Sequence, residues 1–119
     1  MELEHPYSPA YEIEGVAYVS GALSVDADGK SVAGRDAAMD AALRKLSDRL
    51  GTVGMTLANV AKLTYFVTDI SLRDEANAQL VKHFSAPRPA RSFVEVSSLP
   101  YGCSVEIEAV AYRSLGGAA

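Results

Sequence analysis

The sequence contains no tryptophan, one cysteine and two histidines, and each scarcity excludes a class of protein. Cys103 has no second cysteine to pair with, which excludes a disulfide-stapled scaffold and favours a reducing compartment. His5 and His83 lie far apart in the chain and lack the paired spacing of zinc or iron ligands. No metal site is therefore expected.

Long apolar runs and an excess of basic residues are also missing. No apolar stretch is long enough to span a bilayer, and the N-terminus lacks the basic lead and apolar run of a secretory leader. We therefore expect no membrane partner and a cytoplasmic location. The net charge of -4 leaves no basic stripe for a phosphate backbone, so nucleic acid is not expected as a partner.

The remaining composition is that of one compact domain. A length of 119 residues is close to the commonest domain size, and a hydrophobic content of 49% is ordinary for a globular core. We expect a single domain over residues 1–119, without repeats or linkers. The glycine-rich end at 116–119 is typical of a frayed terminus.

The hydrophobic pattern predicts five strands and two helices in the order ββαβαββ. Alternation of apolar and polar residues predicts strands over 89–96 and 104–111. Residues 11–14 and 16–20 predict a hairpin turned at Glu14-Gly15, and the apolar, β-branched run over 61–68 predicts a buried strand. Apolar residues at helical spacing predict helices over 36–50 and 71–84. Ser71 begins a variant capping box for the second helix. The side chains that this helix is expected to bury are Ala76, Leu80, Val81 and Phe84.

This order predicts an α+β domain in which two helices cover one face of a single sheet. The other face carries apolar residues such as Val94 and Val96, which favours a subunit interface over bare solvent. We therefore expect an oligomer. The basic residues of the first helix region alternate with acidic ones, which is typical of a solvated helix face; they are Lys30, Arg35, Arg44, Lys45 and Arg49.

The two C-terminal strands carry the residues best suited to chemistry. Arg91 shares a strand face with Phe93, and an arginine fixed beside an aromatic ring can hold a small carboxylate through two parallel hydrogen bonds. On the next strand Glu106 and Glu108 share a face, and Glu106 could activate water if partial burial raised its pKa. A surface ion pair for the arginine and a solvated strand face for the glutamates are the ordinary alternatives.

Several segments together resemble the signature of one family. They are HPYS at 5–8, SG at 20–21, KLTYFVTD at 62–69, PARS at 89–92 and VEIEA at 105–109. They resemble the RidA/YjgF family of enamine/imine deaminases, also labelled endoribonuclease L-PSP, and the resemblance covers nearly the whole chain. Members hydrolyse reactive 2-aminoacrylate-type intermediates to 2-oxo acids and ammonia. The resemblance implies a chorismate-mutase-like fold and a homotrimer with three pockets between neighbouring subunits.

The resemblance also implies which residues form the pocket. Its carboxylate-binding arginine matches Arg91, and its water-activating glutamate matches Glu106. The other matched pocket positions are Tyr7, Ser20, Gly21 and Asn77. Phe93 stands where some members have cysteine, which makes the pocket bulkier and drier and favours a substrate with a different side chain. Other usual pocket residues are replaced by Pro9, Ala22, Ala38, Lys45 and Leu80.

Three functional hypotheses follow. The first is cofactor-independent hydrolysis of small 2-imino acids, because such imines need a cation, a positioned water and a proton donor but no cofactor. The second is a non-catalytic trimeric module in which Arg91 holds a small carboxylate metabolite. The third, endoribonuclease activity, comes from the old family label and is disfavoured by the acidic balance of the chain.

Overall fold

The computed structural model describes residues 5–114, and these follow the predicted order ββαβαββ. The strands are β1 (Ala10–Ile13), β2 (Val16–Leu23), β3 (Val60–Val67), β4 (Ala90–Glu95) and β5 (Val105–Tyr112), and the helices are α1 (Arg35–Gly51) and α2 (Arg73–His83). The predicted frayed terminus at 116–119 lies outside the described residues.

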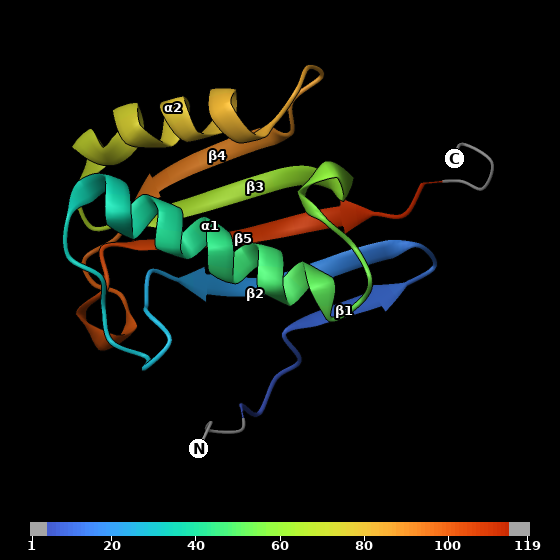
Figure 1. The fold of residues 1–119 in the computed structure, drawn as a ribbon, viewed down its shortest axis with the longest axis horizontal. Helices are drawn as coiled ribbons and strands as arrows, with labels where there is room; N and C mark the ends of the chain where they lie inside the picture. The colour runs from blue at the N-terminus through green and yellow to red at the C-terminus, as the bar shows by residue number, and fades with distance from the viewer. Residues whose placement is uncertain (1–4, 115–119) are drawn as a thin grey trace.

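Within residues 5–114 the five strands form one mixed sheet in the order β1-β2-β5-β3-β4. β3 and β4 are parallel, and α2 forms the crossover between them, whereas the other neighbouring strands are antiparallel. Figure 1 shows both helices on the same face of this sheet. The predicted single sheet with two helices on one face is therefore confirmed.

The core lies between the helices and the alternate sheet residues that point toward them. β3 and β5 contribute fully buried side chains, and α1 covers them with an apolar stripe. The main members are Leu63, Tyr65, Val67, Val105 and Ile107 from the sheet and Met39, Leu46 and Leu50 from α1. The opposite sheet face keeps large apolar side chains exposed, namely Tyr11, Ile13, Tyr18, Val94 and Tyr112.

Two expectations for the second helix are wrong. Val81, predicted to be buried, is 66% exposed, whereas the polar Gln79 is buried. Gln79 is satisfied there because its amide oxygen accepts from the Tyr65 hydroxyl at 2.7 Å and its amide nitrogen donates to the Met39 carbonyl at 2.9 Å. The start also differs, since the Asp69 side chain accepts from the Ser71 N–H at 2.9 Å and caps a short 3₁₀ turn before α2.

β2 is irregular at one position, where its register against β5 shifts between Val19 and Ala22. Ser20 and Gly21 occupy this bulge. A bulge re-aims the side chains around it, and two of the predicted pocket residues lie here. No helix in residues 5–114 is long and apolar enough to cross a bilayer.

Candidate functional site

Arg91 lies on the edge strand β4, on the face of the sheet that the helices cover. It pairs with Leu63 in the parallel ladder, and paired residues share a face. Its guanidinium carbon lies 5.5 Å from the centre of the Tyr65 ring and 5.1 Å from the centre of the Phe93 ring. Burial lowers the pKa of Arg91, and its buried Nη1 has no hydrogen-bond acceptor among residues 5–114. Arg91 is therefore a partly desolvated cation with an unmet donor.

Phe93 lies beside this arginine. The Phe93 ring is 5.8 Å from the Tyr65 ring, so Phe93 shares the face of Arg91 as the alternation predicts. Asn77 is exposed on α2, and its role in a pocket stays a prediction. We call Arg91 and Phe93 the β4 edge cluster.

Glu106 lies half-buried on β5, against the bulge of β2. A Cβ atom at Gly21 would lie only 2.7 Å from Cδ of Glu106, so the missing side chain of Gly21 makes room for this carboxyl group. Burial raises the pKa of Glu106, the nearby charge of Glu108 raises it further, and Arg49 opposes both. Glu106 is therefore more basic than an ordinary surface glutamate.

Ser20 fixes the N-terminal segment to the same bulge. Its hydroxyl donates to the Ser8 carbonyl at 2.7 Å, and its backbone N–H donates to the Pro9 carbonyl at 2.9 Å. This segment carries Tyr7, whose ring stacks on His5 with centres 4.8 Å apart. We call Tyr7, Ser20, Gly21 and Glu106 the β2 bulge cluster.

The two predicted central residues, Arg91 and Glu106, do not meet within one protomer. Arg91 pairs with Leu63 of β3, whereas Glu106 pairs with Phe66 of the same strand. Leu63 and Phe66 are three positions apart, so they point to opposite faces and are separated by about 10 Å along the strand. A single chain therefore places the cation and the carboxylate on opposite sides of its sheet.

Arg49 corrects one expectation from the sequence. The charge pattern of the first helix predicts a solvated side chain for Arg49, but this side chain is only 7% exposed. Its guanidinium carbon lies 5.8 Å from the centre of the Tyr7 ring, and its buried Nε has no acceptor in the described part of the chain. The sequence did indicate that Arg49 is buried, because Arg49 follows Ala42 and Leu46 at helical spacing on the buried stripe of α1.

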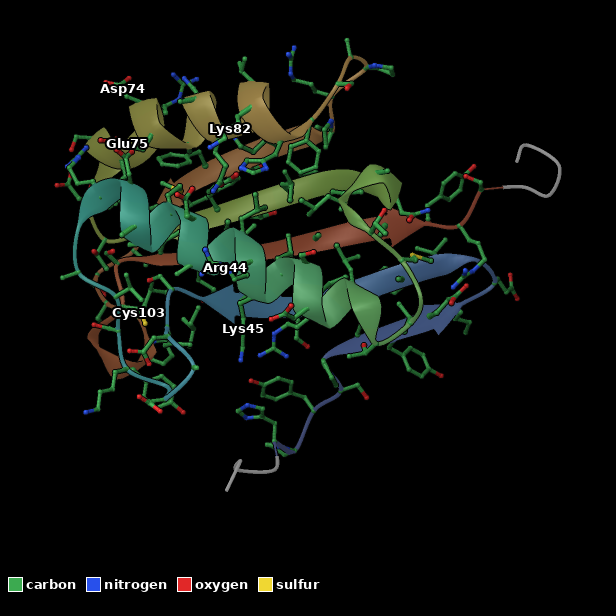
Figure 2. All side chains as sticks on the ribbon, in the orientation of Figure 1. Arg44, Lys45, Asp74, Glu75, Lys82 and Cys103 are labelled. Atoms are coloured by element: carbon green, nitrogen blue, oxygen red, sulfur yellow. The ribbon has the colours of Figure 1, made fainter. Side chains whose placement is uncertain are left out.

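A separate groove of about 360 Å³ lies between α1 and α2. Its lining includes Asp40, Arg44, Ser47, Lys82 and His83. Figure 2 shows Arg44 on α1 and Lys82 on α2. None of the predicted pocket residues lines this groove, and none of its side chains has a buried polar atom without a partner. It therefore lacks the chemical features of the two clusters.

Cys103 lies just before β5 (Figure 2) and is buried. Its thiol donates to the Ser24 carbonyl at 3.6 Å, and burial raises its pKa. A protonated, hydrogen-bonded thiol is not a nucleophile, so Cys103 packs as a small apolar residue beside the start of β5.

Comparisons with known proteins identify the family. The family model for endoribonuclease L-PSP matches residues 1–113. The chain is 36% identical to the 2-iminobutanoate/2-iminopropanoate deaminase of Bos taurus over 91% of this chain and 80% of that protein.

Solved structures show the same fold. RidA from an Antarctic Psychrobacter species superposes with a TM-score of 0.85 at 30% identity, over 93% of this chain and 91% of the other. Escherichia coli TdcF with bound serine superposes with a TM-score of 0.81 at 25% identity, over 94% and 91%. This chain belongs to the RidA/YjgF family.

Proposed function

We propose that this protein hydrolyses small 2-imino acids and enamines of the 2-aminoacrylate type to 2-oxo acids and ammonia, without a cofactor. The observation that carries this proposal is the unmet donor of Arg91. A buried guanidinium N–H without an acceptor is costly, and a carboxylate is the acceptor that fits its planar fork best. The flanking rings of Tyr65 and Phe93 hold the guanidinium in place for a small planar acid.

Glu106 is the proposed general base. Its raised pKa brings the carboxylate closer to the operating pH, where a base is most effective. Glu106 takes a proton from water as the water oxygen bonds to the imine carbon. Returning this proton to the nitrogen gives a carbinolamine. The hydroxyl proton of the carbinolamine then passes through Glu106 to the nitrogen, the carbon–nitrogen bond breaks, and ammonia leaves a 2-oxo acid behind. One imine and one water are consumed, so the reaction needs no metal and no oxidant.

We propose that the site is completed by a second copy of the chain in a homotrimer. The open sheet face exposes Tyr18 and Tyr112 at 53% each, and this apolar face needs a cover. A neighbouring copy supplies that cover and also brings its β2 bulge cluster to the β4 edge cluster of the first copy. Closed threefold symmetry then gives three equal sites between subunits.

A non-catalytic carboxylate-binding module is the second candidate. The unmet donor of Arg91 fits it equally well, and the serine bound to the relative TdcF is also a small carboxylate. This candidate gives no role to a buried glutamate with a raised pKa. The acidic balance of the chain gives no support to RNA cleavage.

The test is imine decay measured with the wild type and two variants. 2-Aminoacrylate and 2-iminobutanoate are generated in situ by an amino-acid dehydratase, and their disappearance is followed. We expect the wild type to accelerate decay and Arg91→Ala to lower kcat/KM by about 10²–10³-fold, because the substrate carboxylate loses its partner. Arg44→Ala removes an equal charge from the exposed side of α1 and should change nothing.

If the wild type leaves both imines at their spontaneous rates, the deaminase proposal fails for these substrates. Calorimetry with pyruvate and 2-oxobutanoate then tests the binding module. Binding by the wild type that is lost in Arg91→Ala would make that candidate the better account.

A further inference from the structure

The proposed mechanism leaves one buried cation unused. Arg49 lies near the end of α1 and is 7% exposed, although arginine is almost never fully buried without a partner. Its Nε is shielded from solvent and has no acceptor among residues 5–114. A charged side chain in this position indicates an anion that residues 5–114 do not supply.

The surroundings of Arg49 place it at the β2 bulge cluster. Its guanidinium lies 5.8 Å from the centre of the Tyr7 ring. Tyr7 belongs to the segment that the Ser20 hydroxyl holds through Ser8. The charge of Arg49 also reaches Glu106, where it favours the ionised carboxyl. Arg49 therefore lies over the candidate pocket tyrosine, and its charge acts on the proposed general base.

Two other arginines, unlike Arg49, form ion pairs with carboxylates. Arg35 lies 2.7 Å from the Glu75 carboxylate, and Arg113 lies 2.6 Å from the Glu12 carboxylate. In the described part of the chain, the buried side-chain polar atoms without a partner belong to Arg49 and Arg91 alone. One lies at each of the two clusters that together form the proposed site. Two unmet cationic donors fit a ligand with two anionic groups.

We propose that Arg49 determines substrate specificity by binding a second carboxylate, so that the preferred substrates are imines of 2-oxo dicarboxylic acids. This inference rests on the proposed function. Arg91 of one copy holds the carboxylate next to the imine carbon. Arg49 of the neighbouring copy holds the carboxylate at the far end of the substrate side chain. The chemistry is unchanged: the imine and water give a 2-oxo dicarboxylic acid and ammonia.

The experiment compares a dicarboxylic with a monocarboxylic imine. Amino-acid oxidases generate 2-iminoglutarate from glutamate and 2-iminopropanoate from alanine, and each decay is followed with wild type, Arg49→Met, Arg49→Lys and Arg44→Met. We expect the wild type to prefer the dicarboxylic imine about tenfold or more in kcat/KM. Arg49→Met should abolish this preference by raising KM for the dicarboxylic imine. Arg49→Lys keeps a positive charge and should retain part of the preference. Arg44→Met, on the exposed side of the same helix, should retain it.

The outcomes separate this inference from the proposed function. Hydrolysis of both imines without a preference in the wild type overturns the role of Arg49 and leaves the deaminase intact. The same holds if Arg49→Met keeps the preference. If the wild type hydrolyses neither imine, the second carboxylate site is tested by the increase in Tm that 2-oxoglutarate and pyruvate each produce. A larger shift with 2-oxoglutarate that Arg49→Met loses supports the second carboxylate site, and equal shifts overturn it. If Arg49→Met does not fold, the preference of the wild type and its retention in Arg49→Lys remain the test.

Discussion

The β4 edge cluster and the β2 bulge cluster differ in charge and in the face of the sheet they occupy. The first offers a guanidinium held between aromatic rings on the helix-covered face. The second offers a carboxyl group with a raised pKa against a glycine on the open face. The first is suited to binding an anion and the second to moving a proton. One chain by itself does not bring the proposed cation and the proposed base together, and this separation is the reason for proposing a site shared between copies.

The largest expected effect comes from Glu106→Gln. Loss of the base should lower kcat by about 10²–10⁴-fold while changing KM much less. This pattern is the reverse of that expected for Arg91→Ala, which acts mainly on binding. Glu14→Gln is the matched control, because Glu14 is exposed between β1 and β2 and its charge is not among those that shift the pKa of Glu106.

The pH profile sharpens the assignment of Glu106. Only the ionised carboxylate accepts a proton, so kcat of the wild type should fall as the pH drops through the raised pKa of Glu106. Glu106→Gln should lack this acidic limb. An unchanged pH profile in the variant would contradict the role of Glu106 as the base.

Gly21→Ala should have the next largest effect. The new methyl group would occupy the place of the Glu106 carboxyl and push it aside, because its Cβ would lie 2.7 Å from Cδ. We expect a loss of about 10–10²-fold in kcat, measured with the same imines. A Cβ at Gly51 meets nothing within 4 Å, so Gly51→Ala is the control and should keep full activity.

A double variant tests whether Gly21 acts through Glu106. In a Glu106→Gln background, Gly21→Ala should cost little further activity, because the displaced base is already absent. Fully additive losses would show that Gly21 has another role.

Phe93→Ala should weaken substrate binding by Arg91 without affecting the proposed base. The ring lies 5.1 Å from the Arg91 guanidinium, and its removal frees that side chain and admits water. We expect KM to rise about three- to tenfold with little change in kcat. Val81→Ala, an apolar truncation at an exposed position of α2, should leave KM unchanged. A fall in kcat alone for Phe93→Ala would contradict a role in holding the arginine.

The smallest expected effect is on stability. Because the folded-state pKa of Glu106 is raised, the folded protein holds this proton to higher pH than the unfolded chain does. Its ionised form therefore lowers stability above the raised pKa, and this penalty disappears as the pH falls below the ordinary glutamate range. Glu106→Gln should raise Tm by about 1–3 °C at neutral pH and by nothing near pH 4. A lower Tm for Glu106→Gln than for the wild type at neutral pH would contradict a stability cost from the partly buried Glu106 charge.

Local patterns in the sequence were enough to predict the elements. Alternation marked the face of β4 that carries Arg91 and Phe93, and Gly15, with a φ of 84°, marks the hairpin turn between β1 and β2. The order ββαβαββ follows from the same signals. These features depend on neighbours in the chain, which a sequence displays directly.

Features that depend on tertiary contacts were missed. Gln79 is buried in place of Val81 because Tyr65 and Met39, distant in sequence, satisfy its amide. The burial of Arg49 did have a local signal, its place on the apolar stripe of α1, but the charge pattern of that helix favoured a solvated position. The opposite faces of Arg91 and Glu106 follow from how both strands pair with β3, and pairing register is not written in either strand alone.

The most direct test of a site shared between copies is complementation between two inactive variants. Arg91→Ala and Glu106→Gln are unfolded, mixed in equal amounts and refolded, and assembly is checked by light scattering. Each mixed trimer has one site that combines an intact Arg91 from one copy with an intact Glu106 from the next, so about one site in four is intact over all randomly reassembled trimers. The account predicts that imine hydrolysis returns to about a quarter of the wild-type rate. Mixed trimers with no more activity than either variant alone would contradict it.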